Sequence, residues 1–253
     1  MGISTYSSFT YGHTITTDNQ LINFSEGGAQ LTATMPIGSV SLADFVPLIA
    51  TALNNVGGQE YSTSLDRTTR KITISSVGNF ELLPIAGTNS AISTYPLIGY
   101  TADTSGSNTY EADEASGLIY SPQNLLQKFT DFQDNVKTTS ASVRQTPSGQ
   151  VEVVSYGQIE FMECMVMPIT DVIPQLSIIS NANAVAEFRA FMRYGTTKAP
   201  MEFIENILVP TTFQKCLLES TAKSKQGVDF KIQESKKLFN WFESGPLVFR
   251  GLI

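Results

Sequence analysis

The side chains best suited to nucleophilic, acid–base or metal chemistry are one histidine, His13, and two cysteines, Cys164 and Cys216. A Ser-His-Asp set is assembled in space, but His13 lies in a polar stretch that we expect to be extended, with no patterned carboxylate beside it. Structural zinc sites use closely spaced ligand pairs, whereas the two cysteines are 52 positions apart. Both cysteines lie in apolar, strand-like runs. We therefore expect small, reduced core residues, with a disulfide between them as the alternative.

A short acidic segment offers a second set of candidate ligands. Glu111, Asp113 and Glu114 lie close together, with Asp103 upstream of them. Calcium accepts several carboxylate and carbonyl oxygens, so these side chains could gather round it. The ordered Asp-x-Asp-x-Asp-Gly pattern is missing, which favours a solvated acidic loop.

Two glycine pairs and an aromatic cluster complete the candidates. The pairs at 27–28 and 57–58 are not followed by the Gly-Lys-Ser/Thr of a phosphate-binding loop. Trp241, near Phe239 and Phe242, could form a binding face, although such clusters more often close a sheet or contact a subunit. The sequence thus predicts no catalytic residue, no cofactor, no cofactor-binding residue and no metal site. We expect that the protein is not an enzyme.

The composition indicates an ordered, acidic chain. Of its 253 residues, 42% are hydrophobic and 15% are charged, which argues against long disorder. The net charge of −7 and the lack of a basic run argue against a general grip on nucleic acid. The N-terminus resembles no signal peptide, and no apolar run is long enough to cross a bilayer. We expect synthesis in the cytoplasm and no membrane partner.

The clearest element is a helix over 183–194. Asn183 is suited to cap it, Phe188 and Phe191 fall on its apolar face, and Gly195 is expected to close it. Strand-like runs precede and follow this helix, the first being 201–204. The sequence therefore predicts that residues 147–253 form an antiparallel sheet or small sandwich with one packed helix.

The first hundred residues divide into two expected parts. Residues 1–40 predict an N-terminal arm or hairpin, with a turn at 26–28 and no continuous apolar face. Residues 41–100 predict a small α+β module. Its helix starts after Ser41, or one turn later after Asp44 because Pro47 is unfavourable inside a helix.

The rest of this module is expected to be a hairpin and a strand followed by a helical turn. The hairpin joins EYSTSL to KITISS through a polar turn, and NFELLPIAG is expected to be a third strand. The helical turn lies in SAISTYPLIGY and is expected to break at Pro96, with Leu97, Ile98 and Tyr100 returning to the core.

Residues 101–146 predict a linker with a connecting helix or strand. The stretch 101–117 is rich in turn-forming and acidic residues and is expected to be a long loop. Helical spacing of apolar residues favours a helix over 122–134, but a strand from KTTSASVRQ could extend backward into it. A turn at 147–149 is expected to lead into the second sheet.

Two stretches resemble a known class of protein. The first has a helix ending in Ala-Leu-Asn, a Tyr-Ser hairpin with Asp-Arg before Lys-Ile-Thr-Ile-Ser, and a closing Ile-Gly-Tyr; it is similar to a module of phage virion proteins. The second is the C-terminal half, whose single helix on a sheet resembles the tail-tube-like fold of tube, distal tail and baseplate ring proteins. No galectin-like or carbohydrate-binding insertion is recognisable, although many distal tail proteins carry one.

The resemblance implies a structural component of a phage tail, at the tail tip or baseplate, forming a ring around or at the end of the tail tube. It implies a hexameric or trimeric homo-oligomer in the virion, other tail and baseplate proteins as partners, and DNA passing through without tight binding. Residues 1–40 and 101–120 are expected to reach onto neighbouring subunits. The alternative is a carbohydrate- or receptor-binding virion module that uses Trp241 or the loop at Tyr110.

Overall fold

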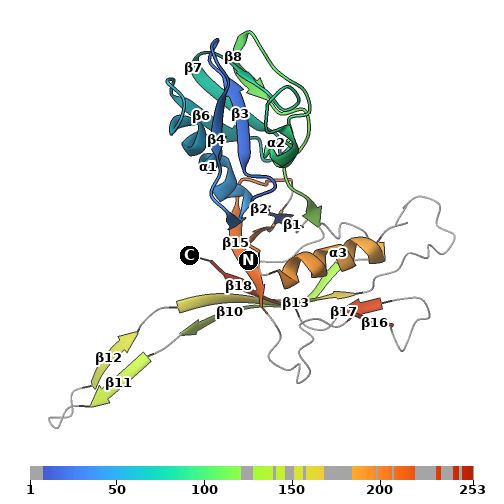
Figure 1. The fold of residues 1–253 in the computed structure, drawn as a ribbon. Coiled ribbons are helices and arrows are strands. Elements are labelled where there is room, and N and C mark those ends of the chain that lie inside the picture. Colours follow the sequence, from blue (N-terminus) through green and yellow to red (C-terminus); the bar gives the residue numbers. More distant parts are fainter. Residues whose placement is uncertain are drawn as a thin grey trace. The chain divides into compact units, whose positions relative to one another are not determined.

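Strands dominate the chain and helices are few (Figure 1). The computed structural model describes residues 8–120, 128–138, 141–145, 151–155, 158–167, 184–197, 199–206, 208–219, 232–234, 242–244 and 247–252. Wherever the register between two of these strands is defined, the strands run antiparallel. The chain is therefore α+β and mostly β, as the sequence predicts.

The chain forms two compact units. The N-terminal unit consists of Phe9–Ile119 together with Ala199–Thr212, and the C-terminal unit of Met1–Ser8, Tyr120–Lys198 and Phe213–Ile253. The sequence instead predicts the change of domain near residue 147. The two divisions differ in two places: residues 120–146 belong to the C-terminal unit, and residues 199–212 belong to the N-terminal unit although they follow the C-terminal helix in sequence.

Strands and one main helix make up the N-terminal unit. Its elements are β1 (Ser8–Tyr11), β2 (His13–Ile15), β3 (Leu21–Ser25), β4 (Leu31–Thr34), β5 (Gly38–Val40), α1 (Leu42–Asn54), β6 (Tyr61–Leu65), β7 (Ile72–Leu82), a 3₁₀ turn (Ser90–Ile92), α2 (Tyr95–Ile98), β8 (Ser107–Glu111), β9 (Ile119–Tyr120) and β14 (Met201–Ile204). The strand order β4-β3-β7-β6, with β8 also on β7, defines its main sheet.

The two hairpins of this sheet have the turns that the sequence predicts. β3 pairs with β4 across the turn at 26–28, and β6 pairs with β7 so that Leu65 lies opposite Ile72. The expected third strand is not separate, because Asn79–Leu82 continues β7, which there pairs with β3. One long strand thus joins both hairpins into a single sheet.

The main helix, α1, begins where its capping sequence predicts. The Ser41 hydroxyl accepts from the Asp44 N–H at 3.2 Å and donates to the Asp44 carboxylate at 2.7 Å. The alternative start at Asp44 is wrong, because Pro47 lies inside the helix with its ring on the exposed side. Phe45 and Ile49 on the opposite face are fully buried.

The core of the N-terminal unit draws on every part of residues 15–112. Its buried members are Ile15, Ile22, Phe24, Ala33, Met35, Leu42, Phe45, Val46, Ile49, Ala52, Leu53, Tyr61, Ile72, Ile74, Phe80, Leu82, Tyr95, Ile98, Tyr100 and Ala112. Ile98 and Tyr100 return to the core as predicted, and Leu97 packs against it partly buried. Pro96 does not break the helical turn, because it lies in the first turn of α2, where a missing N–H costs little.

Two segments expected to lie outside a core are part of it. Residues 8–40 are not an arm, since β2, β3 and β4 each contribute buried apolar side chains, among them Ile15 and Phe24. Residues 101–117 are not a plain loop, since β8 pairs with β7 and Ala112 is buried. Both segments thus contribute to this core, and their contact with neighbouring subunits stays a prediction; positions 1–7 lie outside the described residues.

The C-terminal unit is built on a sheet of order β10-β13-β18-β15. Its elements are β10 (Lys128–Thr138), β11 (Ala141–Gln145), β12 (Val151–Ser155), β13 (Gln158–Met167), α3 (Ala184–Thr196), β15 (Phe213–Glu219), β16 (Ile232–Glu234), β17 (Phe242–Ser244) and β18 (Leu247–Gly251). The helix expected over 122–134 is wrong from residue 128 onward, where β10 begins. The strand that the sequence left as the alternative is present, and residues 121–127 lie outside the description.

A two-stranded ribbon, β11–β12, continues the long hairpin of β10 and β13 (Figure 1). Thr138 lies opposite Gln158, and the same register resumes with Ala141 opposite Ser155 and Gln145 opposite Val151. The expected turn at 147–149 lies outside the described residues. Among the strands that are described, β11 and β12 pair only with each other.

Helix α3 covers the predicted range and packs by the predicted residues. Phe188 and Phe191 are fully buried, and the Phe191 ring lies 6.3 Å from that of Phe249 on β18. Gly195 does not close the helix, which runs on to Thr196. A Cβ at Gly195 would lie 2.2 Å from the Leu218 side chain on β15, so close packing explains this glycine. The expected cap Asn183 lies outside the described residues.

Candidate functional site

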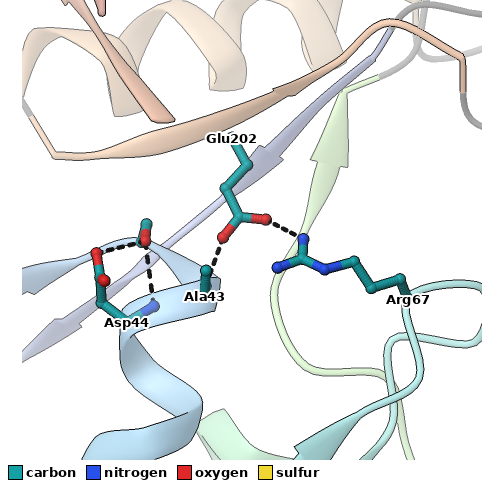
Figure 2. Close-up of polar contacts among 5 residues, drawn as sticks. Ala43, Asp44, Arg67 and Glu202 are labelled. Atoms are coloured by element: carbon teal, nitrogen blue, oxygen red, sulfur yellow. Dashed lines mark hydrogen bonds and ion pairs between the residues drawn. The ribbon is translucent and has the colours of Figure 1, made fainter. Parts of the chain in front are cut away.

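The most buried charge in the described chain is the Glu202 carboxylate, on β14 (Figure 2). Its side chain is 0% exposed. One oxygen accepts a hydrogen bond from the Ala43 backbone N–H, and the other forms an ion pair with Arg67 (Figure 2). Burying an unpaired carboxylate is costly, so these two partners account for its presence in the interior.

The first partner belongs to the N-terminus of α1. The first backbone N–H groups of a helix have no partner within it and carry the positive end of the helix dipole. Ser41 satisfies the N–H of Asp44, and Glu202 satisfies that of Ala43. The helix end thus holds a carboxylate from a strand far along the chain.

The second partner is held by the turn between β6 and β7. The Asp66 carboxylate accepts from the N–H groups of Thr68 at 2.8 Å and Thr69 at 3.3 Å. The bond from Thr68 is the main reason that the Asp66 pKa is lowered. Arg70 closes the turn with a left-handed φ of 59°, and its side chain donates to the Gly117 carbonyl. This turn positions Arg67 toward Glu202.

The Glu202 cluster fits a structural clamp better than a reacting group. Both carboxylate oxygens are engaged, and the carboxylate is closed to solvent. A general base needs reach to the proton of a substrate, which full burial denies. We infer that the cluster ties β14 to α1 and to the β6–β7 turn.

His13 lies in a setting that the sequence does not predict. It is buried on β2, its Nε2 lies 2.9 Å from the Ser116 hydroxyl, and its ring centroid lies 4.3 Å from that of Phe45. A histidine within hydrogen-bond reach of a serine is the arrangement of an activated nucleophile. Here the Ser116 hydroxyl donates to the Leu97 carbonyl at 2.7 Å, so it accepts from a protonated Nε2. In this arrangement His13 donates a proton to the hydrogen bond, whereas a general base would accept the proton of the Ser116 hydroxyl. The pair therefore lacks the geometry of an activated serine.

Acid is expected to destabilise the protein through His13. Burial lowers the pKa of His13 to about 4, whereas an unfolded histidine titrates near 6.5. Between these values the unfolded chain binds a proton that the native chain does not, so stability falls as the pH drops from about 6.5 to about 4. The loss amounts to about 3 kcal/mol over the full interval. Urea unfolding at pH 7 and pH 4.5 measures most of it.

Carboxylates also titrate between pH 7 and pH 4.5, so a control must separate their contribution to the pH dependence from that of His13. His13→Gln retains a donor for Ser116 and removes the titrating ring, so its stability should fall less between the two pH values than that of the parent. Equal pH dependence in the two proteins would show that His13 is not the group responsible.

The aspartates of the acidic segment accept hydrogen bonds from nearby backbone and hydroxyl groups. Asp113 accepts from the N–H and hydroxyl of Thr101 at 2.8 and 2.9 Å, and Asp103 accepts from the Ile85 N–H at 2.8 Å. Glu111 lies 3.7 Å from Lys71. In the described part of the chain, no group of three or more His, Cys, Asp or Glu side chains could hold a metal ion.

The remaining predicted contact residues have different outcomes. The Tyr110 hydroxyl donates to the Phe80 carbonyl and accepts from the Ser107 N–H, both at 2.8 Å, so its polar end is turned inward. Trp241 and Phe239 lie outside the described residues, while Phe242 belongs to β17. Cys216 is buried in the core, as predicted.

Sequence reasoning missed Glu202 and the partner of His13. A lone Glu within the apolar run of β14 was the available signal for Glu202, since all four residues of that strand are buried. Nothing local indicates Ser116, which lies 103 positions from His13. Comparison with protein-family models and with curated proteins finds no match. No helix in the described residues has the length and apolar character needed to span a membrane.

Proposed function

We propose that the chain is a structural subunit of a phage tail, located at the tail tip or baseplate. It assembles with copies of itself into a ring of six or three subunits around or at the end of the tail tube, and DNA passes through without tight binding. The observation that carries the proposal is the β11–β12 ribbon of the C-terminal unit. It adds to the resemblance of the sequence to phage virion proteins.

A protruding two-stranded ribbon is unfavourable in a protein that stays monomeric. A two-stranded hairpin is marginally stable in water, and its outer edges present unpaired backbone groups that favour pairing with another chain. Val143 lies opposite Val153 in this ribbon. In the sequence, Ala141 and Val143 alternate with polar residues, and β12 contains three valines. Among the described strands, no further strand lies beside the ribbon, so a valine-rich ribbon of this kind is suited to pairing with a neighbour.

Further support comes from the rest of the molecule. A single helix packed on an antiparallel sheet agrees in outline with the tail-tube-like fold. The buried Glu202 and His13 clusters are suited to holding the fold. Residues 9–119 contain ten Asp or Glu against three Lys or Arg, which suits a surface that does not grip DNA.

Assembly is expected to depend on the apolar positions of the ribbon. The purified chain should form ring-shaped particles in negative stain, and Val143→Lys should reduce them about tenfold or more at equal concentration, because a charge replaces an apolar side chain at the proposed contact. Ser142→Lys introduces the same charge at a polar position of the same strand and is the matched control. Monomeric parent protein at high concentration would contradict the proposed function, and equal assembly of the two variants would exclude the ribbon as the contact.

A further inference from the structure

One carboxylate joins the turn of the β3–β4 hairpin to the segment between α1 and β6. Both oxygens of Glu26 accept from the Gly58 N–H, each at 3.0 Å. Its Oε1 atom also accepts from the Gln59 N–H at 3.1 Å and from the Tyr61 hydroxyl at 3.0 Å. Three donors therefore converge on this carboxylate.

The contact explains the glycine pair at 57–58. A Cβ at Gly57 would lie 2.7 Å from Glu26 Oε1 and 2.8 Å from the Tyr61 ring, which is too close for a Cβ without movement of its neighbours. A Cβ at Gly58 would lie 3.2 Å from the other Glu26 oxygen. The pair is not followed by the Gly-Lys-Ser/Thr of a phosphate-binding loop, but it lets backbone N–H groups approach an anion closely in a similar way.

The donors are held by hydrogen bonds that do not involve the carboxylate. Asn54, at the end of α1, accepts from the Tyr61 N–H at 2.6 Å and donates to the Tyr61 carbonyl at 3.0 Å. The Gln59 side chain accepts from the Ser76 hydroxyl at 2.7 Å and from the Gly78 N–H at 2.9 Å, both on β7. We therefore expect the donors to keep their positions when the carboxylate is removed.

These donors lie at the surface of the N-terminal unit. Gly58 is exposed and Glu26 is only half-buried. Burial, and then the hydrogen bond to Glu26, raises the pKa of Tyr61 above its ordinary value, so the Tyr61 hydroxyl stays a donor. A small anion in solution can therefore reach these donors once the Glu26 side chain is absent.

We propose that the Gly58 and Gln59 N–H groups and the Tyr61 hydroxyl form a carboxylate-binding site, which the chain fills with its own Glu26. A planar carboxylate fits because one N–H is shared between its two oxygens and the other donors meet one of them. Glu26 belongs to the same chain and so has a high effective concentration, which excludes a carboxylate from solution. The contact is thus autoinhibitory. This inference does not depend on the proposed tail function.

Removal of Glu26 in the full chain tests the site. Relative to chloride at equal ionic strength, about 100 mM acetate should raise the melting temperature of Glu26→Ala by about 3 °C or more, because acetate binds the vacated donors. The parent should change by less than about 1 °C, because Glu26 already fills the site. Glu60→Ala removes an exposed carboxylate next to Gln59 and is the matched control, which should behave like the parent.

Amide NMR of Glu26→Ala locates the bound acetate. The Gly58 and Gln59 resonances should shift and saturate as acetate is added, and a further Tyr61→Phe change should weaken acetate binding about fivefold or more. Equal acetate responses of Glu26→Ala and Glu60→Ala, or no shift at Gly58 and Gln59, would overturn the site. If Glu26→Ala does not fold, Glu26→Gln, whose neutral amide is a weaker ligand, takes its place, and the same two resonances must respond to acetate.

Discussion

Glu202→Ala is expected to lower the free energy of unfolding by about 3–5 kcal/mol, the range for removing one partner of a buried ion pair. The substitution leaves the Arg67 guanidinium without this carboxylate and the Ala43 N–H without its acceptor. Arg67 is only 17% exposed, so water replaces the lost partner poorly. Urea denaturation at pH 7 measures the change.

Two further substitutions separate the charge from the hydrogen bond. Glu202→Gln retains an acceptor for Ala43 and should cost less than Glu202→Ala. Glu111→Ala is the matched control, because Glu111 is 61% exposed and lies 3.7 Å from Lys71, and exposed pairs contribute little. If Glu202→Ala and Glu111→Ala have similar effects, the clamp has no energetic importance.

Phe191→Ala is expected to cost about 3–5 kcal/mol, with a similar loss for Phe188→Ala. Both rings are fully buried, and the Phe191 ring centroid lies 6.3 Å from that of Phe249 on β18. Truncation is therefore expected to open a cavity between α3 and the sheet. Phe191→Leu keeps most of the volume and should cost distinctly less. Thermal unfolding followed by circular dichroism compares the three variants. A shift of only a degree or two for both alanine variants would show that the helix face does not stabilise the fold.

The sequence predicts those elements that have a repeating pattern within their own residues. The hairpin of β6 and β7 has alternating residues and a polar turn, and α3 repeats its apolar residues at helical spacing, so both were found from the sequence. The helix prediction is wrong from residue 128 onward. Phe129, Phe132 and Val136 fit helical spacing, but pairing with β13 makes this segment the strand β10. Such pairing is invisible in the stretch itself.

The core of residues 8–40 was missed for a related reason. β2, β3 and β4 are short, and each supplies only a few apolar side chains, so none shows an apolar face long enough to recognise. Ile15, Ile22 and Ala33 form one core only when the strands are brought together. The Glu202 clamp and the His13–Ser116 contact likewise join residues far apart in sequence, which leaves no repeated local pattern.

The position of Glu202 in the chain bears on synthesis at the ribosome. Residues 9–119 emerge first, but the carboxylate that caps α1 and pairs with Arg67 comes from Ala199–Thr212. At bacterial to eukaryotic translation speeds of about 5–20 residues per second, that segment follows roughly 5–20 seconds later. During this interval α1 of the nascent N-terminal unit has its Ser41 cap but lacks the acceptor for the Ala43 N–H, and Arg67 lacks its carboxylate. Its final stability is therefore reached only after Ala199–Thr212 has been made.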